Sequence, residues 1–168
     1  MKEILTIKNL NIRFEEPVVK NLSISLCAQE TLAIVGESGS GKSITAKAIM
    51  QILPQGCKVS NNSSIYFGET NLLSLTNKEM QSIRGNKIAM VFQEALSALN
   101  PVMTIGEQIL EALKTHNIKH PGGNKHYILQ LLQEVHLSNP EESYNSYPHQ
   151  LSGGMNQRAM IAIAIAPK

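Results

Sequence analysis

The sequence is poor in the residues that mark secreted or metal-binding proteins. Its 168 residues contain no tryptophan and only two cysteines, Cys27 and Cys57. The two cysteines lack metal-ligand spacing, and the N-terminus shows no apolar leader region. We therefore expect reduced thiols, although the sequence leaves a single disulfide open.

Long apolar runs and a charge excess are also lacking. No apolar stretch reaches the roughly 18 to 20 residues that span a bilayer, so any membrane span of the system would come from another chain. The net charge is only +2 and no basic run stands out. We therefore predict no nucleic-acid partner. With 42% hydrophobic and 17% charged residues, the composition is typical of a folded globular protein.

A glycine-rich stretch stands out against this background. It follows the apolar run 31–35, which we predict to be a strand, and precedes a predicted helix over 44–53. The order strand, glycine turn, helix is the context in which G-x-x-x-x-G-K-[ST] forms a phosphate-binding loop. Backbone N–H groups and the helix start attract the anion, Lys42 would contact the β- and γ-phosphates, and Ser43 would hold Mg²⁺. The predicted nucleotide-binding residues of this loop are Gly36, Glu37, Ser38, Gly39, Ser40, Gly41, Lys42 and Ser43.

A second anion-binding pattern lies more than a hundred residues later. Ser152, Gly153 and Gly154 precede an apolar helix-like run. Ser152 is a good N-cap, and the two glycines leave the first N–H groups of the helix accessible. One nucleotide rarely needs both patterns from one subunit. We therefore predict a head-to-tail dimer in which these residues close over the phosphates held by the partner's loop.

The rest of the chain predicts a sheet followed mainly by helices. Alternating apolar residues before position 27 predict an antiparallel sheet with a turn at 15–17, and a short strand is expected at 64–67. Capping boxes at 76–79 and 104–107 predict helix starts, and an apolar face predicts another helix around 128–135. The apolar run 87–92 is predicted to be a strand, and 139–149 a polar loop.

Three further features are open to two interpretations. Phe14 could stack on an adenine ring or face the core. Gln93 follows the predicted strand 87–92 and could reach a bound metal or attacking water, or it could be a turn residue. The five histidines, of which His116 and His120 are four residues apart, are interpreted as solvated loop residues rather than metal ligands.

These motifs together resemble the ATP-binding subunits of ABC transporters. The stretch 36–43 is similar to their Walker A motif, Gln93 to their Q-loop, and Leu151–Gly154 to their signature motif. The resemblance covers the whole chain. It implies ATP and Mg²⁺ as ligands, with Ser43 and Gln93 near the metal and Phe14 near the adenine.

The finer resemblance is to importer ATPases for dipeptides, oligopeptides and nickel. It rests on residues 35–43, on Leu99-Asn100-Pro101 and on 104–108, and on Met155 after the signature. It implies transmembrane permease subunits, a second ATP-binding subunit and an extracytoplasmic substrate-binding protein as partners. It also implies a peripheral location at the cytoplasmic face of the membrane. It does not distinguish peptide from nickel cargo.

One family feature is not found within these 168 residues. After the signature helix, family members continue into the Walker B strand, whose aspartate serves Mg²⁺ and whose glutamate polarises the attacking water. We therefore expect hydrolysis by this chain alone to be nearly abolished, and the isolated chain to be marginally stable.

The expected fold is an α/β P-loop core with an N-terminal antiparallel β-subdomain and an inserted α-helical subdomain, lacking its C-terminal core strands. The single, incomplete ATP-binding domain is divided into 1–93 (β-subdomain and P-loop core), 94–150 (helical subdomain) and 151–168 (signature and helix). The leading function is ATP binding and hydrolysis coupled to import of peptides or nickel. The alternative is a non-hydrolysing nucleotide-binding fragment or regulatory module.

Overall fold

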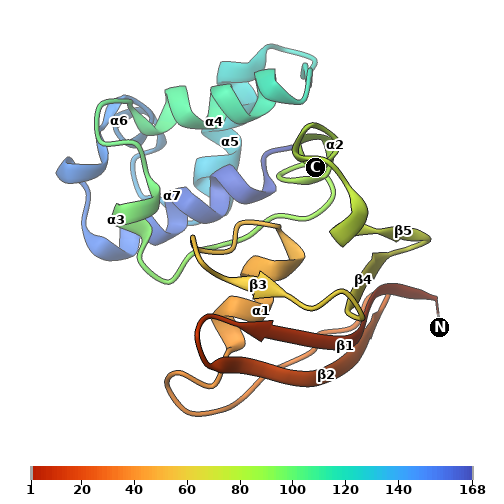
Figure 1. Cartoon of the computed structure of the whole chain (residues 1–168). Coiled ribbons are helices and arrows are strands. Elements are labelled where there is room, and N and C mark those ends of the chain that lie inside the picture. The colour runs from red at the N-terminus through yellow and green to blue at the C-terminus, as the bar shows by residue number, and fades with distance from the viewer. Residues whose placement is uncertain (1, 168) are drawn as a thin grey trace. The chain divides into compact units, whose positions relative to one another are not determined.

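The computed structural model describes residues 2–167 and divides the chain into two compact units (Figure 1). The first unit ends at Gln81 and the second begins at Ser82. Residues 82–93, which the sequence analysis grouped with the P-loop core, therefore belong to the second unit. Each unit has its own interior and is described by itself.

The first unit is built on an antiparallel sheet in the order β2-β1-β4-β5. Strand β1 (Glu3–Arg13) pairs along one edge with β2 (Pro17–Cys27), and 15–16 lie in the connecting turn. Its other edge pairs with β4 (Ser64–Phe67) and, near its end, with β3 (Lys58–Val59). Strand β5 (Thr70–Asn71) closes the sheet beside β4. The predicted N-terminal antiparallel sheet is confirmed.

Two asparagines in left-handed backbone conformations shift the alternation of buried residues in this sheet. Asn9 has φ 50° and Asn21 has φ 48°, and the β1–β2 register changes between Ile7 and Leu10. A bulge adds one residue to a strand, so Ile7 and Leu10 face the same buried side although they are three apart. Asparagine tolerates this conformation better than most residues.

Local signals predicted three helices of the chain. The helix predicted over 44–53 is α1 (Lys42–Ile49), which begins two residues earlier and ends four residues earlier than expected, and a 3₁₀ turn (Leu72–Ser74) precedes α2 (Asn77–Ile83). At the start of α2, Glu79 accepts hydrogen bonds from the side chain and backbone of Thr76, which lower the pKa of its carboxyl group. At α4 (Ile105–Thr115), the Thr104 side chain and Glu107 form the predicted capping box.

The core of the second unit is formed by α4, α5 (Asn124–Glu134) and α7 (Gly153–Ile165), which contact one another (Figure 1). The short helix α3 (Ala95–Ala98) also packs on α7. Tyr127 of α5 donates a hydrogen bond to the Ala166 carbonyl, and burial raises the pKa of its phenol. The buried residues of this core are Leu99, Ile105, Ile109, Leu113, Ile128, Leu131, Leu132, Leu137, Ala159, Ala162 and Ala166.

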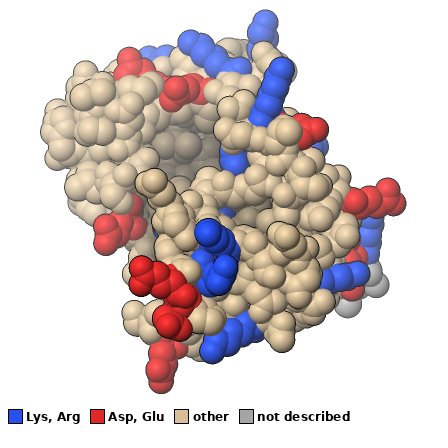
Figure 2. All heavy atoms as spheres, viewed as in Figure 1, with Lys and Arg blue, Asp and Glu red and all other residues tan. Residues whose placement is uncertain are grey.

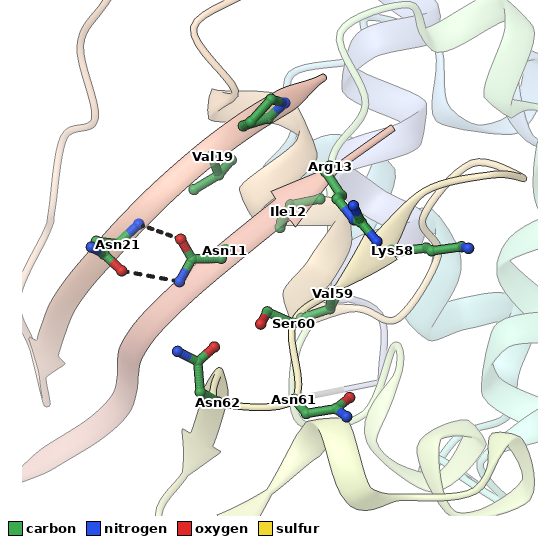
Figure 3. Close-up of a pocket in the computed structure, with 11 residues that line it drawn as sticks. Asn11, Ile12, Arg13, Val19, Asn21, Lys58, Val59, Ser60, Asn61 and Asn62 are labelled. Atoms are coloured by element: carbon green, nitrogen blue, oxygen red, sulfur yellow. Dashed lines mark hydrogen bonds between the residues drawn. The ribbon is translucent and has the colours of Figure 1, made fainter. Parts of the chain in front are cut away.

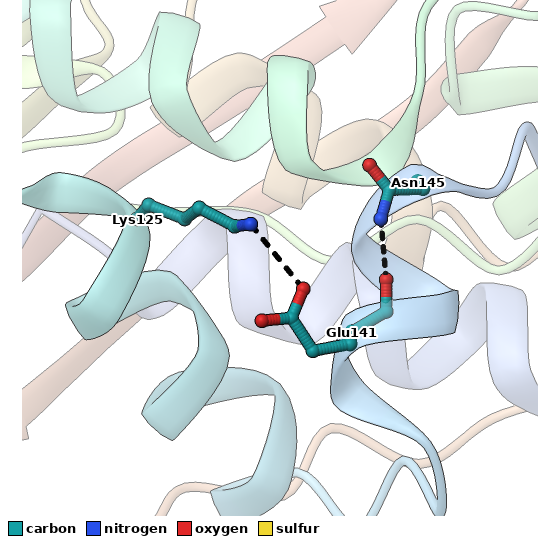
Figure 4. Close-up of polar contacts among 3 residues, drawn as sticks. All are labelled: Lys125, Glu141 and Asn145. Atoms are coloured by element: carbon teal, nitrogen blue, oxygen red, sulfur yellow. Dashed lines mark hydrogen bonds and ion pairs between the residues drawn. The ribbon is translucent and has the colours of Figure 1, made fainter.

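The prediction of a loop over 139–149 is wrong, because this segment contains a helix. Helix α6 (Pro140–Asn145) begins with proline, whose fixed φ suits the first helical position, and carries Glu141 and Glu142 in its first turn. Glu141 pairs with Lys125 of α5 at 3.3 Å, and its carbonyl accepts from Asn145 at 2.8 Å (Figure 4). A second 3₁₀ turn (Pro148–Gln150) follows.

Two predicted strands are not formed. Residues 31–35 and 87–92 have no strand assignment, apart from an isolated bridge between Arg84 and Ile88. A strand needs a neighbour to receive its backbone hydrogen bonds, and no described strand pairs with either run. Their apolar side chains stay largely accessible to solvent, with Val35 92% exposed.

Not all histidines are the solvated loop residues that the sequence suggested. The ring of His120 stacks on Tyr127 with centroids 3.5 Å apart, and its Nε2 is buried without a hydrogen-bond partner. Among residues 2–167, no group of three histidine, cysteine or acidic residues could hold a metal ion, and the two cysteines are free thiols. Within the same residues, no helix has the length and apolar character to cross a bilayer.

The contact between α4 and α6 predicts how a substitution of Gly106 changes the free energy of unfolding. An added Cβ would lie 2.5 Å from the Tyr144 ring. Glycine to alanine in a helix normally stabilises by about 1 kcal/mol. Here overpacking should reverse the sign, and Gly106→Ala should lower the free energy of unfolding by roughly 1–3 kcal/mol in urea denaturation. Gly154→Ala, in the first turn of α7 where nothing lies within 4 Å, is the matched control. Equal effects of the two substitutions would contradict the packing argument.

Candidate functional site

The glycine-rich loop lies at the start of α1 in the first unit. Its residues up to Ser40 are exposed, and Gly41 is the N-cap of the helix with φ 88°. Gly39 also has a left-handed backbone, with φ 83°. These two conformations turn the chain sharply into the helix and require glycine, since an L side chain is strained there.

The ammonium group of Lys42 lies inside this loop. Its Nζ donates to the carbonyl oxygens of Gly36 at 2.7 Å and Glu37 at 2.6 Å, and to the Ser40 hydroxyl at 3.2 Å. All three hydrogens of the ammonium are therefore directed at the loop that surrounds it. A phosphate oxygen entering the loop would replace one or more of these acceptors with a charged one, which binds an ammonium more strongly.

Close approach requires glycine at Gly41, whereas the near contact of Gly36 is with the rotatable Ser40 hydroxyl. A Cβ on Gly36 would lie 2.8 Å from the Ser40 hydroxyl, and one on Gly41 would lie 2.8 Å from a methyl group of Val19 and 3.0 Å from the carbonyl oxygen of Val18. The loop is thus fixed against β2 while its other side stays open. An accessible backbone, a helix start and a held ammonium fit a phosphate group.

Ser43 is exposed in the first turn of α1, where a hydroxyl could serve a magnesium ion bound with the phosphates. Phe14 lies in the turn between β1 and β2 and is 38% exposed. The interpretation of Phe14 as a core residue is therefore wrong. Its ring remains accessible, as the predicted contact with adenine requires.

In the second unit, Gln93 and one residue of the Ser-Gly-Gly motif, Gly153, line the same groove. The groove has a volume of about 840 Å³ and is lined by segment 93–97 and by Pro148, His149, Leu151, Gly153, Asn156 and Gln157. Ser152 caps α7, since its hydroxyl accepts from the Met155 N–H at 3.3 Å. No heavy atom lies within 4 Å of a Cβ built on Gly153 or Gly154. The chain itself therefore does not require glycine at these two positions.

A buried asparagine in the lining of this groove was not among the residues predicted from the sequence. The Asn156 side chain is buried and donates to the carbonyl oxygens of Pro148 at 2.9 Å and Leu151 at 3.3 Å. It ties the segment before the motif to the first turn of α7. Tyr147 and His149 of the same segment stack with ring centroids 5.6 Å apart. Asn156 stands beside Gln157 and Arg158 in the sequence, so no sequence signal marked it as the buried polar residue of the three.

The structure therefore places the predicted residues in two groups. The loop 36–43 and Phe14 lie in the first unit, and Gln93 and residues 152–154 lie in the second. On the molecular face drawn in Figure 2, lysine, arginine, aspartate and glutamate are interspersed rather than separated by sign.

Comparison with known proteins decides the family. The sequence model described as "ABC transporter" matches residues 19–168. The chain belongs to the ABC transporter family. The inferred resemblance is thus confirmed, together with the fold class.

Relatives of this ABC protein include ATP-binding subunits of peptide importers. The chain is 42% identical to the dipeptide transport ATP-binding protein DppD of Lactococcus lactis subsp. cremoris, covering 98% of this chain and 49% of the relative. It is 41% identical to the oligopeptide transport ATP-binding protein OppD of Bacillus subtilis, covering 97% and 47%. The chain therefore spans about half the length of the curated relatives it matches.

Solved ABC cassettes have the same fold. The dimeric structure of MJ0796, a bacterial ABC transporter cassette, superposes with a TM-score of 0.83 at 29% identity, over 97% of this chain and 69% of that one. A post-hydrolysis dimer of the same cassette, bound to ADP and Pi, gives a TM-score of 0.82 at 29% identity with the same coverage.

The packing of the loop on β2 predicts unequal costs for two glycine substitutions. Gly39→Ala and Gly41→Ala both place a side chain on a left-handed backbone, which costs about 1 kcal/mol. Only Gly41→Ala adds a clash with Val19 and the Val18 carbonyl. Gly41→Ala should therefore lower the free energy of unfolding by roughly 1–3 kcal/mol more than Gly39→Ala in denaturant titration. Equal losses would mean that the loop does not pack on β2.

Proposed function

We propose that this ABC chain binds Mg²⁺-ATP in the loop Gly36–Ser43 and serves as an ATP-binding subunit of a peptide importer. The observation that carries the proposal is the Lys42 ammonium held inside an exposed glycine loop at a helix start. Bound Mg²⁺-ATP would supply the phosphoryl group whose hydrolysis drives transport in such systems. Lys42 would hold its phosphates, Ser43 its metal ion and Phe14 its adenine.

The proposed cargo and partners are inferred from the relatives. The similar proteins DppD and OppD are named for dipeptide and oligopeptide transport, so a peptide is the favoured cargo, and nickel stays a second candidate from the sequence resemblance. Transmembrane permease subunits, a substrate-binding protein outside the membrane and a location at its cytoplasmic face complete the proposal. The groove beside Gln93 exposes Leu96, which is 60% accessible, and suits an apolar segment of a permease.

The Ser-Gly-Gly motif supports a paired arrangement. Gly153 and Gly154 have empty space around them, although glycine at the start of a helix stabilises it less than alanine would. A ligand or chain approaching from outside explains why no side chains stand there. We propose that Ser152 and these glycines contact the phosphates bound by a second ATP-binding subunit, as in a head-to-tail dimer. Such pairing is consistent with the dimeric cassettes that have the same fold.

The first test is nucleotide binding by a lysine variant. Lys42→Ala should weaken binding of a fluorescent ATP analogue at least about a hundredfold, since it removes a charge-assisted contact to the phosphates. Lys47→Ala removes the same side chain from the last turn of the same helix and should bind normally. Equal affinity of the two variants would refute the assignment of the phosphate site.

A second test distinguishes an effect on dimerisation from an effect on folding stability. Gly154→Ala should keep or raise the free energy of unfolding, because the added methyl group meets no neighbour. It should nevertheless reduce ATP-dependent dimerisation, measured by light scattering with a non-hydrolysable analogue, without weakening nucleotide binding to the monomer. Normal dimerisation of this variant would argue against phosphate contact by the motif.

A turnover measurement distinguishes the alternative function. ATP hydrolysis by the protein as its own cell produces it, assembled with its partners, supports the transport ATPase. Tight ATP binding without turnover in that assembly supports the non-hydrolysing regulatory module instead.

A further inference from the structure

A polar hollow lies in the first unit, at one end of the hairpin formed by β1 and β2. It has a volume of about 650 Å³ and is bordered by the adjoining ends of β1 and β2 and by segment 58–62 (Figure 3). This volume lies in the range of small-molecule sites. None of the residues 36–43 lines it, although Val19, which packs against Gly41, does.

Two cations at one end of the hollow are not neutralised. Arg13 and Lys58 are directly paired across the β1–β3 ladder and both line the hollow (Figure 3). Like charges at paired positions of a sheet destabilise it. Within residues 2–167 neither has an ion-pair partner, and no acidic residue lines the hollow. The arrangement keeps two positive charges side by side, which an anion between them would stabilise.

The walls of the hollow are held in place by hydrogen bonds. The Asn11 amide donates to the Asn21 side chain at 3.1 Å, and its oxygen accepts from the Asn21 N–H at 2.9 Å (Figure 3). Loop 60–63 is fixed to β1, since the Ser60 N–H donates to the Asn11 carbonyl at 3.0 Å and the Ser63 hydroxyl donates to the Asn9 carbonyl at 3.0 Å. The site is therefore organised before any ligand enters.

Other polar groups of the lining are available to a ligand. In the described part of the chain, the side chains of Ser60, Asn61 and Asn62 have no hydrogen-bond partner, and all three line the hollow. Together they add one hydroxyl and two amide groups to the lining, on the loop that lies across the hollow from Arg13 (Figure 3). Cations with neutral amide donors form an environment that suits a small oxyanion with further polar groups.

We propose that this hollow binds a small polar anion, with a phosphate or carboxylate group held between Arg13 and Lys58. Asn62, on the loop across the hollow from Arg13, offers an amide to the rest of the ligand. None of the phosphate-loop residues lines this site, and Arg13, which does line it, precedes Phe14 in the chain. Val19 belongs to the wall of the hollow and to the support of the phosphate loop, so an anion bound here stabilises the sheet edge against which that loop packs.

The test is a calorimetric titration of the protein as its own cell produces it. The phosphate loop is first filled with Mg²⁺ and a non-hydrolysable ATP analogue, and inorganic phosphate or succinate is then added as the probe. We expect one saturable site, and the tighter of the two probes identifies the preferred anion. Lys58→Gln should weaken its binding roughly tenfold, as expected for one lost charge-assisted hydrogen bond.

Lys8→Gln is the matched control, because Lys8 lies on the same strand β1 but outside the hollow, above the Tyr66 ring. It should leave anion binding unchanged. Without an anion, Lys58→Gln should also raise the melting temperature relative to the unsubstituted protein, since it removes the repulsion from Arg13.

The proposal is overturned if neither probe shows saturable binding. It is overturned as well if Lys58→Gln and Lys8→Gln weaken anion binding equally. It also fails if the anion binds only when the nucleotide analogue is absent. Failure of the proposed ATP site is distinguishable, because Lys42→Ala removes only nucleotide binding and Lys58→Gln only anion binding.

Discussion

The first unit depends on the backbone hydrogen bonds of β1, which are shared between both of its edges. Strand β2 occupies one edge, and β4 and β3 divide the other. Strand β2 in turn supports the glycine loop through Val18 and Val19, and loop 60–63 is fixed to β1 at Asn9 and Asn11. A change in the β1 register would therefore move the nucleotide loop and the polar hollow together.

Structure that depends on neighbouring residues could be predicted from the sequence. The capping boxes at 76–79 and 104–107 and the cap at Ser152 involve side chains three residues from their backbone partners, so the local sequence contains the whole interaction. The hairpin of β1 and β2 could be predicted equally well, since its turn and its apolar alternation are local. The bulges were harder to predict, because the sequence shows them only as a shift in the apolar alternation near Asn9 and Asn21.

Structure that depends on distant partners could not be predicted. The runs 31–35 and 87–92 have strand-like composition, but a strand is completed by a ladder, and none of the described strands supplies one. Helix α6 was not predicted, because its stabilising partners are also distant in the sequence. Its sequence is polar and short, and it is held by packing of Tyr144 against Gly106 of α4 and by the contact of Glu141 with Lys125. For the candidate site, the loop, Gln93 and the motif stay predictions from the sequence, and the sequence did not indicate the hydrogen bonds of Asn156.

The glycines of the two motifs differ in whether contacts within the chain explain them. Gly41 is explained within the chain, because it has a left-handed backbone and a side chain there would collide with Val19 and the Val18 carbonyl. Gly153 and Gly154 have no such neighbour and no left-handed backbone, so neither packing nor conformation accounts for them. Open space at two glycines that lower the stability of their own helix is consistent with the external contact proposed for them. This physical observation supports the proposal separately from the family resemblance.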